Sequence, residues 1–324
     1  MSARLGVLFF NLGGPERLED VKPFLVNLFS DPEIIRIRSP FLRKLVAWWI
    51  ATTRRRLSES YYAKIGGGSP LRRLTEAQAE ALERALAACG VEARVYVGMQ
   101  CWAPTIDDAV DRIALDGIER LVVLPLYPQF SLATTGSALH VFEAALARRK
   151  VAGLDRRVIR AWHDDPGYVR ALAATIAPEL AAFPDPGGAA THVVYSAHSV
   201  PQKYIEEGDP YLEHTQRTFD LVEHELGGRH RSTLAFQSKV GPVKWLEPST
   251  NDVIAELGKQ GAKQLLIVPI SFVSDHIETL YEIDILYKGL AAEAGIPHFR
   301  RAPSLNVAPP FVEALRDIVI RAAR

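Results

Sequence analysis

Cysteine is scarce in this sequence, whose 324 residues include only Cys89 and Cys101. Two thiols are too few for a disulfide framework, a Cys-rich zinc site or an iron–sulfur cluster held by four thiolates of one chain. Reduced cytosolic thiols are the simplest interpretation of this pair. The scarcity therefore excludes the classes of protein that draw several cysteine ligands or disulfides from one chain.

An excess of one charge and a long apolar run are also missing. Lys and Arg together number 38, as do Asp and Glu, so no bulk charge attracts nucleic acid and we expect no nucleic-acid partner. The most apolar stretch tested, residues 45–51, is far shorter than the roughly 20 residues that span a bilayer. No signal peptide precedes the first expected strand. We expect a cytoplasmic protein, and peripheral attachment at the inner face of the membrane stays open.

The sequence does contain an alternation of short aliphatic runs and longer amphipathic stretches. Hydrophobic residues make up 48% and charged residues 23%, a balance typical of a globular enzyme. Buried strands are expected at residues 5–10, 93–97, 121–124, 192–195 and 265–268. Amphipathic helices are expected between them, for example at residues 75–88 and 105–115. This alternation predicts an α/β fold with parallel sheets covered by helices on both faces.

An internal similarity relates two parts of the chain. Residues 104–126 parallel residues 248–270, and each segment reads as a helix, a glycine turn, a buried strand and a proline that stops the strand. Breaks rich in Asp, Pro and Gly suit a boundary near residues 162–185. We therefore expect two related α/β lobes, with ligands outside the carboxyl ends of the strands.

His198 lies in the segment that directly follows the expected strand at residues 192–195. Histidine takes up a proton near neutral pH, since its unperturbed pKa is about 6.5. The alternative is a loop histidine that is hydrogen-bonded to the backbone. Ser196 and Ser199 flank it outside any Gly-x-Ser-x-Gly elbow, which argues against a serine nucleophile.

Several carboxylates follow the expected strand at residues 265–268. Glu278 and Glu282 are four residues apart and share one face of an expected helix, and Asp275 lies near the same side. Asp275 and Glu278 could also form a capping arrangement at the helix start. A row of carboxylates can hold a hard divalent metal or pass protons along a line. The alternative is a solvated acidic face.

Two further segments bear on ligand binding. The glycines of residues 65–70 lack the sequence context of a nucleotide-binding loop, and a turn followed by a helix is the simpler interpretation. Residues 36–62 mix aromatic and aliphatic side chains with several arginines. Such a surface suits a large flat anion with carboxylate arms, or an interfacial helix on anionic lipid. An ordinary amphipathic helix is the alternative.

Taken together, these motifs resemble the ferrochelatase family over nearly the entire chain. Seven segments match family segments in family order: residues 10–15, 65–70, 127–131, 134–137, 196–201, 237–242 and 274–282. The resemblance implies an α/β fold of two similar Rossmann-like lobes, each a parallel sheet flanked by helices, with a cleft between them that holds a porphyrin. The first lobe would be residues 1–165, including the lip of the porphyrin pocket, and the second would be residues 166–324.

The resemblance also implies the activity, namely insertion of Fe²⁺ into protoporphyrin IX with release of two protons, a lyase-class reaction of haem biosynthesis. His198 and Glu278 would be the catalytic residues and would also contact the metal, and Asp275, His276 and Glu282 would form a proton or metal path. The implied porphyrin contacts are Leu12, Arg54, Arg55, Tyr62, Ser69, Tyr127 and Trp245. Trp48 and Trp49 would form the apolar lip, with peripheral membrane contact as an option.

Departures from the family pattern qualify these expectations. Gln100 stands where many relatives have Arg. Leu132 occupies the place of an internal cluster cysteine, and no Cys-rich tail follows, so we expect no iron–sulfur cluster and no cofactor beyond the substrate Fe²⁺. Leu12 favours protoporphyrin, because coproporphyrin-using relatives often carry Tyr there. Expected partners are porphyrin, ferrous iron and neighbouring haem-pathway enzymes. A coproporphyrin III ferrochelatase, a chelatase of precorrin-type rings and a non-catalytic tetrapyrrole carrier remain alternatives.

Overall fold

The computed structural model describes residues 5–151, 153–186, 188, 190–228, 230–239, 241 and 243–324, so Val240 and Pro242 of the motif at 237–242 lie outside the described residues. The chain divides into two compact units, residues 1–161 with 315–324 and residues 162–314. The expected single boundary after residue 165 differs from this division at the C-terminus. Residues 315–324 return to the first unit, where the Arg120 guanidinium donates to the Ala323 carbonyl.

The first unit contains a four-stranded sheet with the strand order β2-β1-β3-β4. Its strands, all parallel, are β1 (Leu5–Asn11), β2 (Ala93–Met99), β3 (Arg120–Pro125) and β4 (Asp155–Val158). Strand β1 is buried along its whole length because it pairs with β2 on one side and β3 on the other. The expected strands at the positions of β1, β2 and β3 are confirmed. Strand β4 is exposed throughout, and its charged sequence has no apolar run that could have predicted it.

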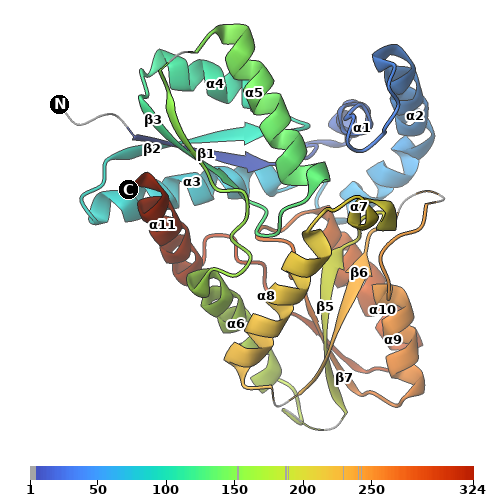
Figure 1. Cartoon of the computed structure of the whole chain (residues 1–324). Helices are drawn as coiled ribbons and strands as arrows, with labels where there is room; N and C mark the ends of the chain where they lie inside the picture. The colour runs from blue at the N-terminus through green and yellow to red at the C-terminus, as the bar shows by residue number, and fades with distance from the viewer. Residues whose placement is uncertain are drawn as a thin grey trace. The chain divides into compact units, whose positions relative to one another are not determined.

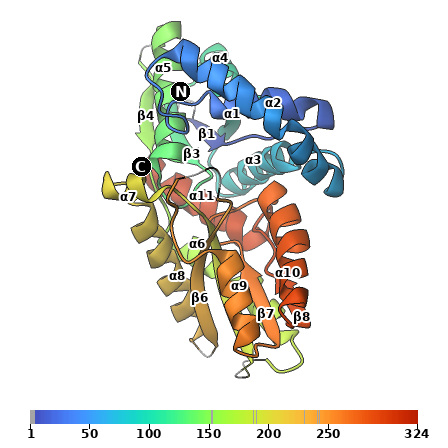
Figure 2. The same cartoon turned by 90° about the vertical axis from the view of Figure 1, so that its right-hand side faces the viewer.

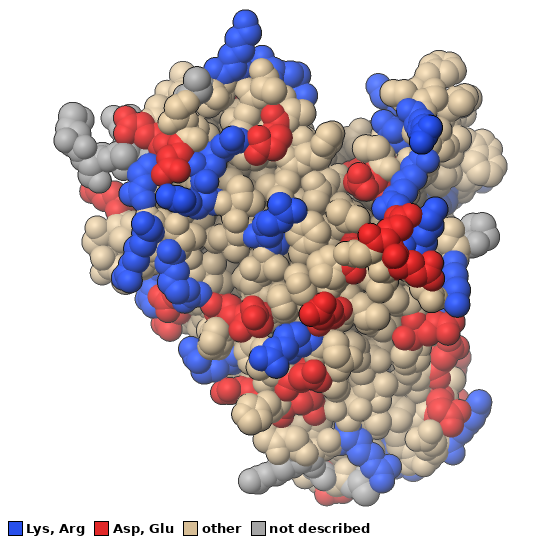
Figure 3. Space-filling view, viewed as in Figure 1, with Lys and Arg blue, Asp and Glu red and all other residues tan. Residues whose placement is uncertain are grey.

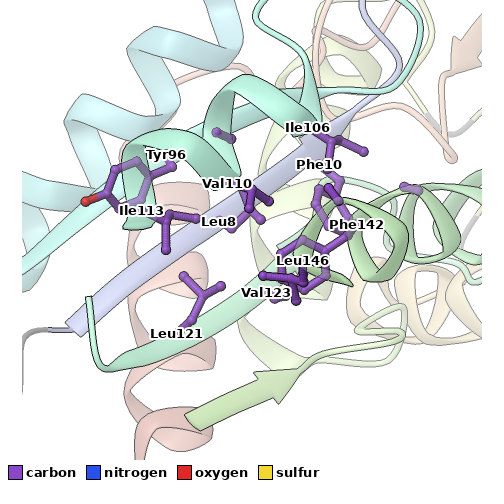
Figure 4. Close-up of a cluster of buried hydrophobic side chains, with 13 residues drawn as sticks. Leu8, Phe10, Tyr96, Ile106, Val110, Ile113, Leu121, Val123, Phe142 and Leu146 are labelled. Carbon is purple, nitrogen blue, oxygen red and sulfur yellow. The ribbon is translucent and has the colours of Figure 1, made fainter. Parts of the chain in front are cut away.

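Helices cover both faces of this first sheet (Figure 1). The helical segments are η1 (Leu18–Asp20), α1 (Val21–Phe29), α2 (Pro40–Lys64), α3 (Leu71–Ala88), α4 (Ile106–Leu115), η2 (Leu132–Gly136), α5 (Ser137–Arg149) and the end of α11 (Pro309–Ala323). Helices α4 and α5 pack on one face, where Phe10 meets Phe142 edge to face with ring centroids 5.7 Å apart (Figure 4). Helix α3 lies on the other face and buries Leu82 and Leu86 completely.

The second unit repeats the architecture around a parallel sheet with the order β6-β5-β7-β8. Its strands are β5 (Thr191–His198), β6 (Arg231–Gln237), β7 (Gln264–Val268) and β8 (His298–Arg301). Its helical segments are α6 (Pro166–Ala181), α7 (Gln202–Glu206), α8 (Tyr211–Leu226), α9 (Thr250–Lys259), η3 (Glu278–Tyr287), α10 (Lys288–Glu293) and the first part of α11. Helices α9 and α10 lie on one face and α6 and α8 on the other (Figure 2). Two helix-flanked parallel sheets confirm the expected fold class.

The internal repeat corresponds to one helix–strand element in each unit, α4 with β3 and α9 with β7. The Thr105 hydroxyl accepts from the backbone N–H of Asp108 at 3.1 Å and thereby caps α4. The Ser249 hydroxyl caps α9 in the same way, accepting from the N–H of Asp252 at 3.1 Å. Both caps satisfy a backbone donor that the first turn of a helix leaves unpaired. The repeated sequence therefore predicts a repeated structure, and the structure confirms it.

The segment that carries Glu278 and Glu282 differs from the expected α-helix. Residues Glu278–Tyr287 form the π-helix η3, which continues directly into α10. The expected capping arrangement of Asp275 is wrong, because Ile277 is the N-cap residue of η3 and no side chain caps this end. π-Helical segments are rare and are frequently found at functional sites. None of the helices in the described ranges has the length and apolarity to cross a bilayer.

Candidate functional site

Polar side chains gather in the second unit, where β5 and β6 end and η3 begins. His198 is the last residue of β5, and both of its backbone groups are held in place. Its N–H donates to Ser271 Oγ at 2.9 Å, and its carbonyl accepts from the Tyr211 hydroxyl at 2.8 Å. The His198 ring lies with Nδ1 2.8 Å from Glu278 Oε2. Two residues that are far apart in sequence therefore form a hydrogen-bonded pair, in which 40% of the His198 side-chain surface is accessible.

The charge of each partner stabilises the charged form of the other. Burial alone would lower the pKa of His198, but the adjacent Glu278 carboxylate outweighs it and raises that pKa above its ordinary value. Burial alone would raise the pKa of Glu278, but His198, His276 and a hydrogen bond from Ser238 lower it to about 2. Glu278 is therefore ionised, and His198 is a stronger base than an isolated imidazole.

Glu282 extends the polar cluster away from His198 and has a different electrostatic environment. Burial and the neighbouring charge of Glu278 raise the pKa of Glu282 above its ordinary value. Its carboxylate accepts from the Gln237 amide at 2.9 Å and from the Tyr287 hydroxyl at 3.1 Å. The two glutamates therefore differ in proton affinity, and Glu282 is the one that holds a proton more readily.

His276 lies on the other side of Glu278. Its Nδ1 is 3.1 Å from the Ser274 carbonyl, and its Nε2 is 4.0 Å from Glu278 Oε1. Its ring packs against Phe272 with centroids 4.6 Å apart. Burial lowers the pKa of His276 below its ordinary value. His276 therefore favours the neutral form, with the Nδ1 hydrogen directed to a carbonyl and a lone pair on Nε2.

Asp275 has its hydrogen-bonding capacity occupied by the fold. Oδ1 lies 3.0 Å from Thr279 Oγ1, 3.0 Å from Arg301 Nη1 and 2.8 Å from Ser304 Oγ. Oδ2 accepts from Asn306 Nδ2 at 2.9 Å. Burial alone would raise the pKa of Asp275, but Arg301 and these hydrogen bonds hold it below its ordinary value. The carboxylate thus fixes the loop before η3, a contribution that sequence reasoning missed because Arg301 and Asn306 come from later segments.

The expected porphyrin contacts in the first unit lie along the α2–α3 connection and after β1 and β3. Leu12 follows β1 directly, Tyr62 is buried near the end of α2, and Ser69 donates its N–H to the Pro15 carbonyl at 2.7 Å. Tyr62 and Ser69 lie close together in the sequence, at the connection of α2 to α3, whereas Leu12 comes from a distant segment. Their contact with a porphyrin stays a prediction.

The remaining expected contacts differ in their surroundings. Arg55 is exposed and pairs with Glu59 through Nε and Oε1 at 2.6 Å, whereas Arg54 one residue earlier is half-buried. The Tyr127 hydroxyl is buried without a hydrogen-bond partner among the described residues, and so is Trp245 Nε1 in the second unit. Buried polar atoms without partners are costly unless a ligand or water completes them.

Gln100 belongs to a buried network that was not foreseen. Its amide nitrogen donates to Asp31 Oδ2 at 2.6 Å and lies 2.9 Å from Ser137 Oγ, and Ser137 itself donates to Asp31 at 2.6 Å. Asp31 is thus a buried carboxylate held by neutral donors. Asp31 and Ser137 follow different helical segments, and nothing in the local sequence around either residue indicates this meeting.

No group of three or more His, Cys, Asp or Glu side chains in the described part of the chain is arranged as a complete metal site. The expected metal contacts of His198 and Glu278 stay a prediction. Cys101 is buried and Cys89 is exposed, both as free thiols. The expectation of no iron–sulfur cluster stays a prediction.

Two solved structures share this architecture. SirB of Bacillus subtilis with Fe³⁺ matches with a TM-score of 0.58 at 14% identity, over 99% of this chain and 96% of that one. DR2241 of Deinococcus radiodurans, described as structurally similar to chelatases, matches with a TM-score of 0.53 at 16% identity, over 99% of this chain and 55% of that one. At these identities the likeness establishes the fold alone.

Sequence comparisons identify the family. The model of the family described as Ferrochelatase matches residues 4–323. Ferrochelatases of Gloeothece citriformis and of Synechococcus sp. (strain JA-3-3Ab) are each 51% identical over 319 residues, which is 98% of this chain and 82% and 93% of theirs. The chain therefore belongs to the ferrochelatase family, the porphyrin metal chelatases of haem biosynthesis.

Proposed function

We propose that this chelatase inserts Fe²⁺ into protoporphyrin IX and that His198 and Glu278 are its catalytic pair. The observation that supports this assignment is the 2.8 Å contact between His198 Nδ1 and Glu278 Oε2 at the carboxyl end of β5. Because Glu278 is ionised, the neutral imidazole carries its hydrogen on Nδ1 and donates it to the carboxylate. Nε2 is then the free acceptor.

The reaction needs such a base. A free porphyrin is planar, and two of its pyrrole nitrogens carry protons that obstruct the incoming metal. The enzyme must bend the ring, accept both protons and deliver a dehydrated ion, which it does by binding a shape closer to the transition state than to the ground state. Nε2 of His198 would take a pyrrole proton, and Glu278 would stabilise the resulting imidazolium. Both residues would also contact the substrate ion as it enters.

The neighbouring side chains divide the remaining tasks. Glu282, which holds a proton more readily than Glu278, would take a proton onward from the pair. His276, favouring its neutral form, presents a lone pair to a proton or to the ion. We assign Asp275 to the positioning of the loop that carries His276, because its oxygens are already engaged by four donors.

The insertion assay tests the function and the identity of the porphyrin. Under anaerobic conditions the protein is supplied with Fe²⁺ and either protoporphyrin IX or coproporphyrin III, and loss of the free-porphyrin absorption bands is followed. We expect insertion with both and a higher kcat/KM for protoporphyrin IX, because Leu12 places no tyrosine hydroxyl after β1. Faster coproporphyrin turnover would favour the coproporphyrin alternative. Tight binding of both without turnover would leave a tetrapyrrole carrier.

We also propose that α2 contacts an anionic membrane surface at the inner face, with the protein otherwise cytoplasmic. Phe41, Trp48 and Trp49 are 75%, 51% and 62% exposed, a concentration of apolar area that soluble surfaces rarely leave uncovered. Lysine and arginine side chains gather over the same helix (Figure 3). Apolar rings beside cations suit an interfacial helix on anionic lipid. Such contact would place the enzyme near other haem-pathway enzymes that handle apolar porphyrins.

Vesicle sedimentation tests the membrane contact. With vesicles containing phosphatidylglycerol, the wild type is expected to co-sediment, and the double substitution Trp48→Ser with Trp49→Ser is expected to reduce the bound fraction about tenfold or more. Leu115→Ser on α4 is a matched control, since Leu115 is 86% exposed on another helix. Equal binding of the wild type and the Trp variant would contradict the proposal.

A further inference from the structure

Ser238 follows β6 in the motif at residues 237–242, and beyond its hydrogen bond to Glu278 no role has been assigned to it. Its backbone has a φ of 65°, in the left-handed region that residues with a side chain rarely adopt. Glycine would adopt this conformation without the steric penalty. A serine at a position that favours glycine indicates that its hydroxyl contributes something glycine cannot, since strained conformations persist where function requires them.

The Ser238 side chain joins the two glutamates of the site. Its Oγ lies 2.9 Å from Glu278 Oε2 and also contacts Glu282 Oε2. Its backbone N–H, directed by the left-handed turn, donates to Glu282 Oε1 at 3.0 Å. Together with the His198–Glu278 contact, these bonds form an unbroken line from His198 Nδ1 through Glu278 and Ser238 to Glu282.

The hydroxyl is the only part of this line that the two carboxylates share. A hydroxyl carries one hydrogen and can accept another, so it can donate to one glutamate while accepting from the other. Without Oγ, Glu282 would keep its bonds from Gln237, from Tyr287 and from the Ser238 N–H. Among the residues that the structure describes, Glu278 Oε2 would keep its bond to His198 alone. Removal of Oγ would therefore cost Glu278 a hydrogen bond and would break its connection to Glu282.

We propose that Ser238 is a positioning residue of the insertion reaction, whose hydroxyl holds Glu278 against His198 and connects it to Glu282. The inference rests on the proposed role of the His198–Glu278 pair. The reaction releases two protons. His198 and Glu278 can pass them on to Glu282 between turnovers if a hydrogen-bonded connection joins the three residues. Ser238 therefore acts on the chemical step, which kcat reports, and not on porphyrin binding.

Two substitutions separate the hydroxyl from the backbone. Ser238→Gly removes Oγ and relieves the left-handed strain, and Ser238→Ala removes Oγ and keeps the strain. We expect both to lower kcat for Fe²⁺ insertion by about tenfold or more, with KM for porphyrin and for Fe²⁺ close to the wild-type values. We expect a larger solvent deuterium isotope effect on kcat in both variants. The melting temperature of Ser238→Gly should be no lower than that of the wild type.

Lys150→Gly is the matched control, because Lys150 has a φ of 52° and lies in the other unit, at the C-terminus of α5. It gains the same backbone relief and should keep wild-type kcat. Wild-type kcat in Ser238→Gly, or a raised KM with unchanged kcat, would overturn the inference alone. A loss confined to Ser238→Ala would also overturn it, since only the backbone would then matter. A wild type without insertion activity would overturn the proposed function, and this inference with it.

Discussion

Replacement of His198 by alanine is expected to lower kcat for Fe²⁺ insertion by about 10²–10⁴-fold, the range that a positioned acid–base group contributes. The ring that would be lost carries the free Nε2, and its Nδ1 is bound to Glu278 at 2.8 Å. Porphyrin affinity should change less than kcat, because the backbone of β5 remains in place. Initial rates measure the first effect, and quenching of protein fluorescence by porphyrin measures the second.

The pair predicts a specific non-additivity. If His198 and Glu278 act as a unit, Glu278→Gln should lose a similar factor, and the double variant should be no slower than the slower single variant. His224→Ala is the control, since His224 is exposed in the last turn of α8. Additive losses would show that the two residues act independently. Unchanged turnover in His198→Ala would remove the proposed catalytic pair altogether.

The sequence predicts the strands that carry this site better than the contacts among its side chains. The five expected strands could be predicted because each contains a mostly apolar run, although β2 is only partly buried, and the repeat of residues 104–126 places similar elements in each unit. His198 and the segment of Glu278 could be placed at strand ends from sequence alone. Their meeting depends on the pairing of β5 with β7, which brings the carboxyl ends of the two strands side by side.

The details that sequence reasoning missed depend on tertiary contacts. The π-helical winding of residues 278–287 has no local signature that distinguishes it from an α-helix. The left-handed backbone of Ser238 could not be predicted, because serine is not a residue type that favours a positive φ. The network of Asp31 with Gln100 joins side chains 69 positions apart in the sequence. Each of these features forms only when the sheet and its loops are assembled, so local propensity carries no signal for it.

Asp275→Asn is expected to destabilise the second unit by about 3 kcal/mol, because a neutral amide replaces a buried carboxylate that accepts four hydrogen bonds, one of them from Arg301. Arg301 is bound by Asp275 at 3.0 Å and by Asp284 at 2.7 Å, and the Arg301 and Asp275 side chains are 14% and 19% accessible. For a unit of this size that loss corresponds to a decrease in melting temperature of about 6–12 °C. Asp220→Asn is the control. Asp220 is exposed on α8, and within the described structure its carboxylate accepts a hydrogen bond from Gln216 alone.

The acid dependence of this effect has a definite sign. The folded-state pKa of Asp275 lies below its ordinary value, so its carboxylate binds fewer protons in the folded than in the unfolded chain. The stabilisation is therefore complete above the unfolded pKa of about 3.9 and is lost as pH falls through the folded pKa. The difference in melting temperature between wild type and Asp275→Asn should be constant near neutral pH and should shrink in acid.

The same variant separates the two roles that Asp275 could have. If the carboxylate only fixes the loop before η3, Asp275→Asn should lose stability and keep a kcat close to that of the wild type, measured well below its melting temperature. If it conducts protons or the ion, kcat should fall where the protein is still fully folded. The four donors bound to its oxygens favour the first outcome, since they and the charge of Arg301 lower the pKa of Asp275 and so disfavour its taking up a passing proton. His276 and Glu282 would then be the side chains through which protons and iron move.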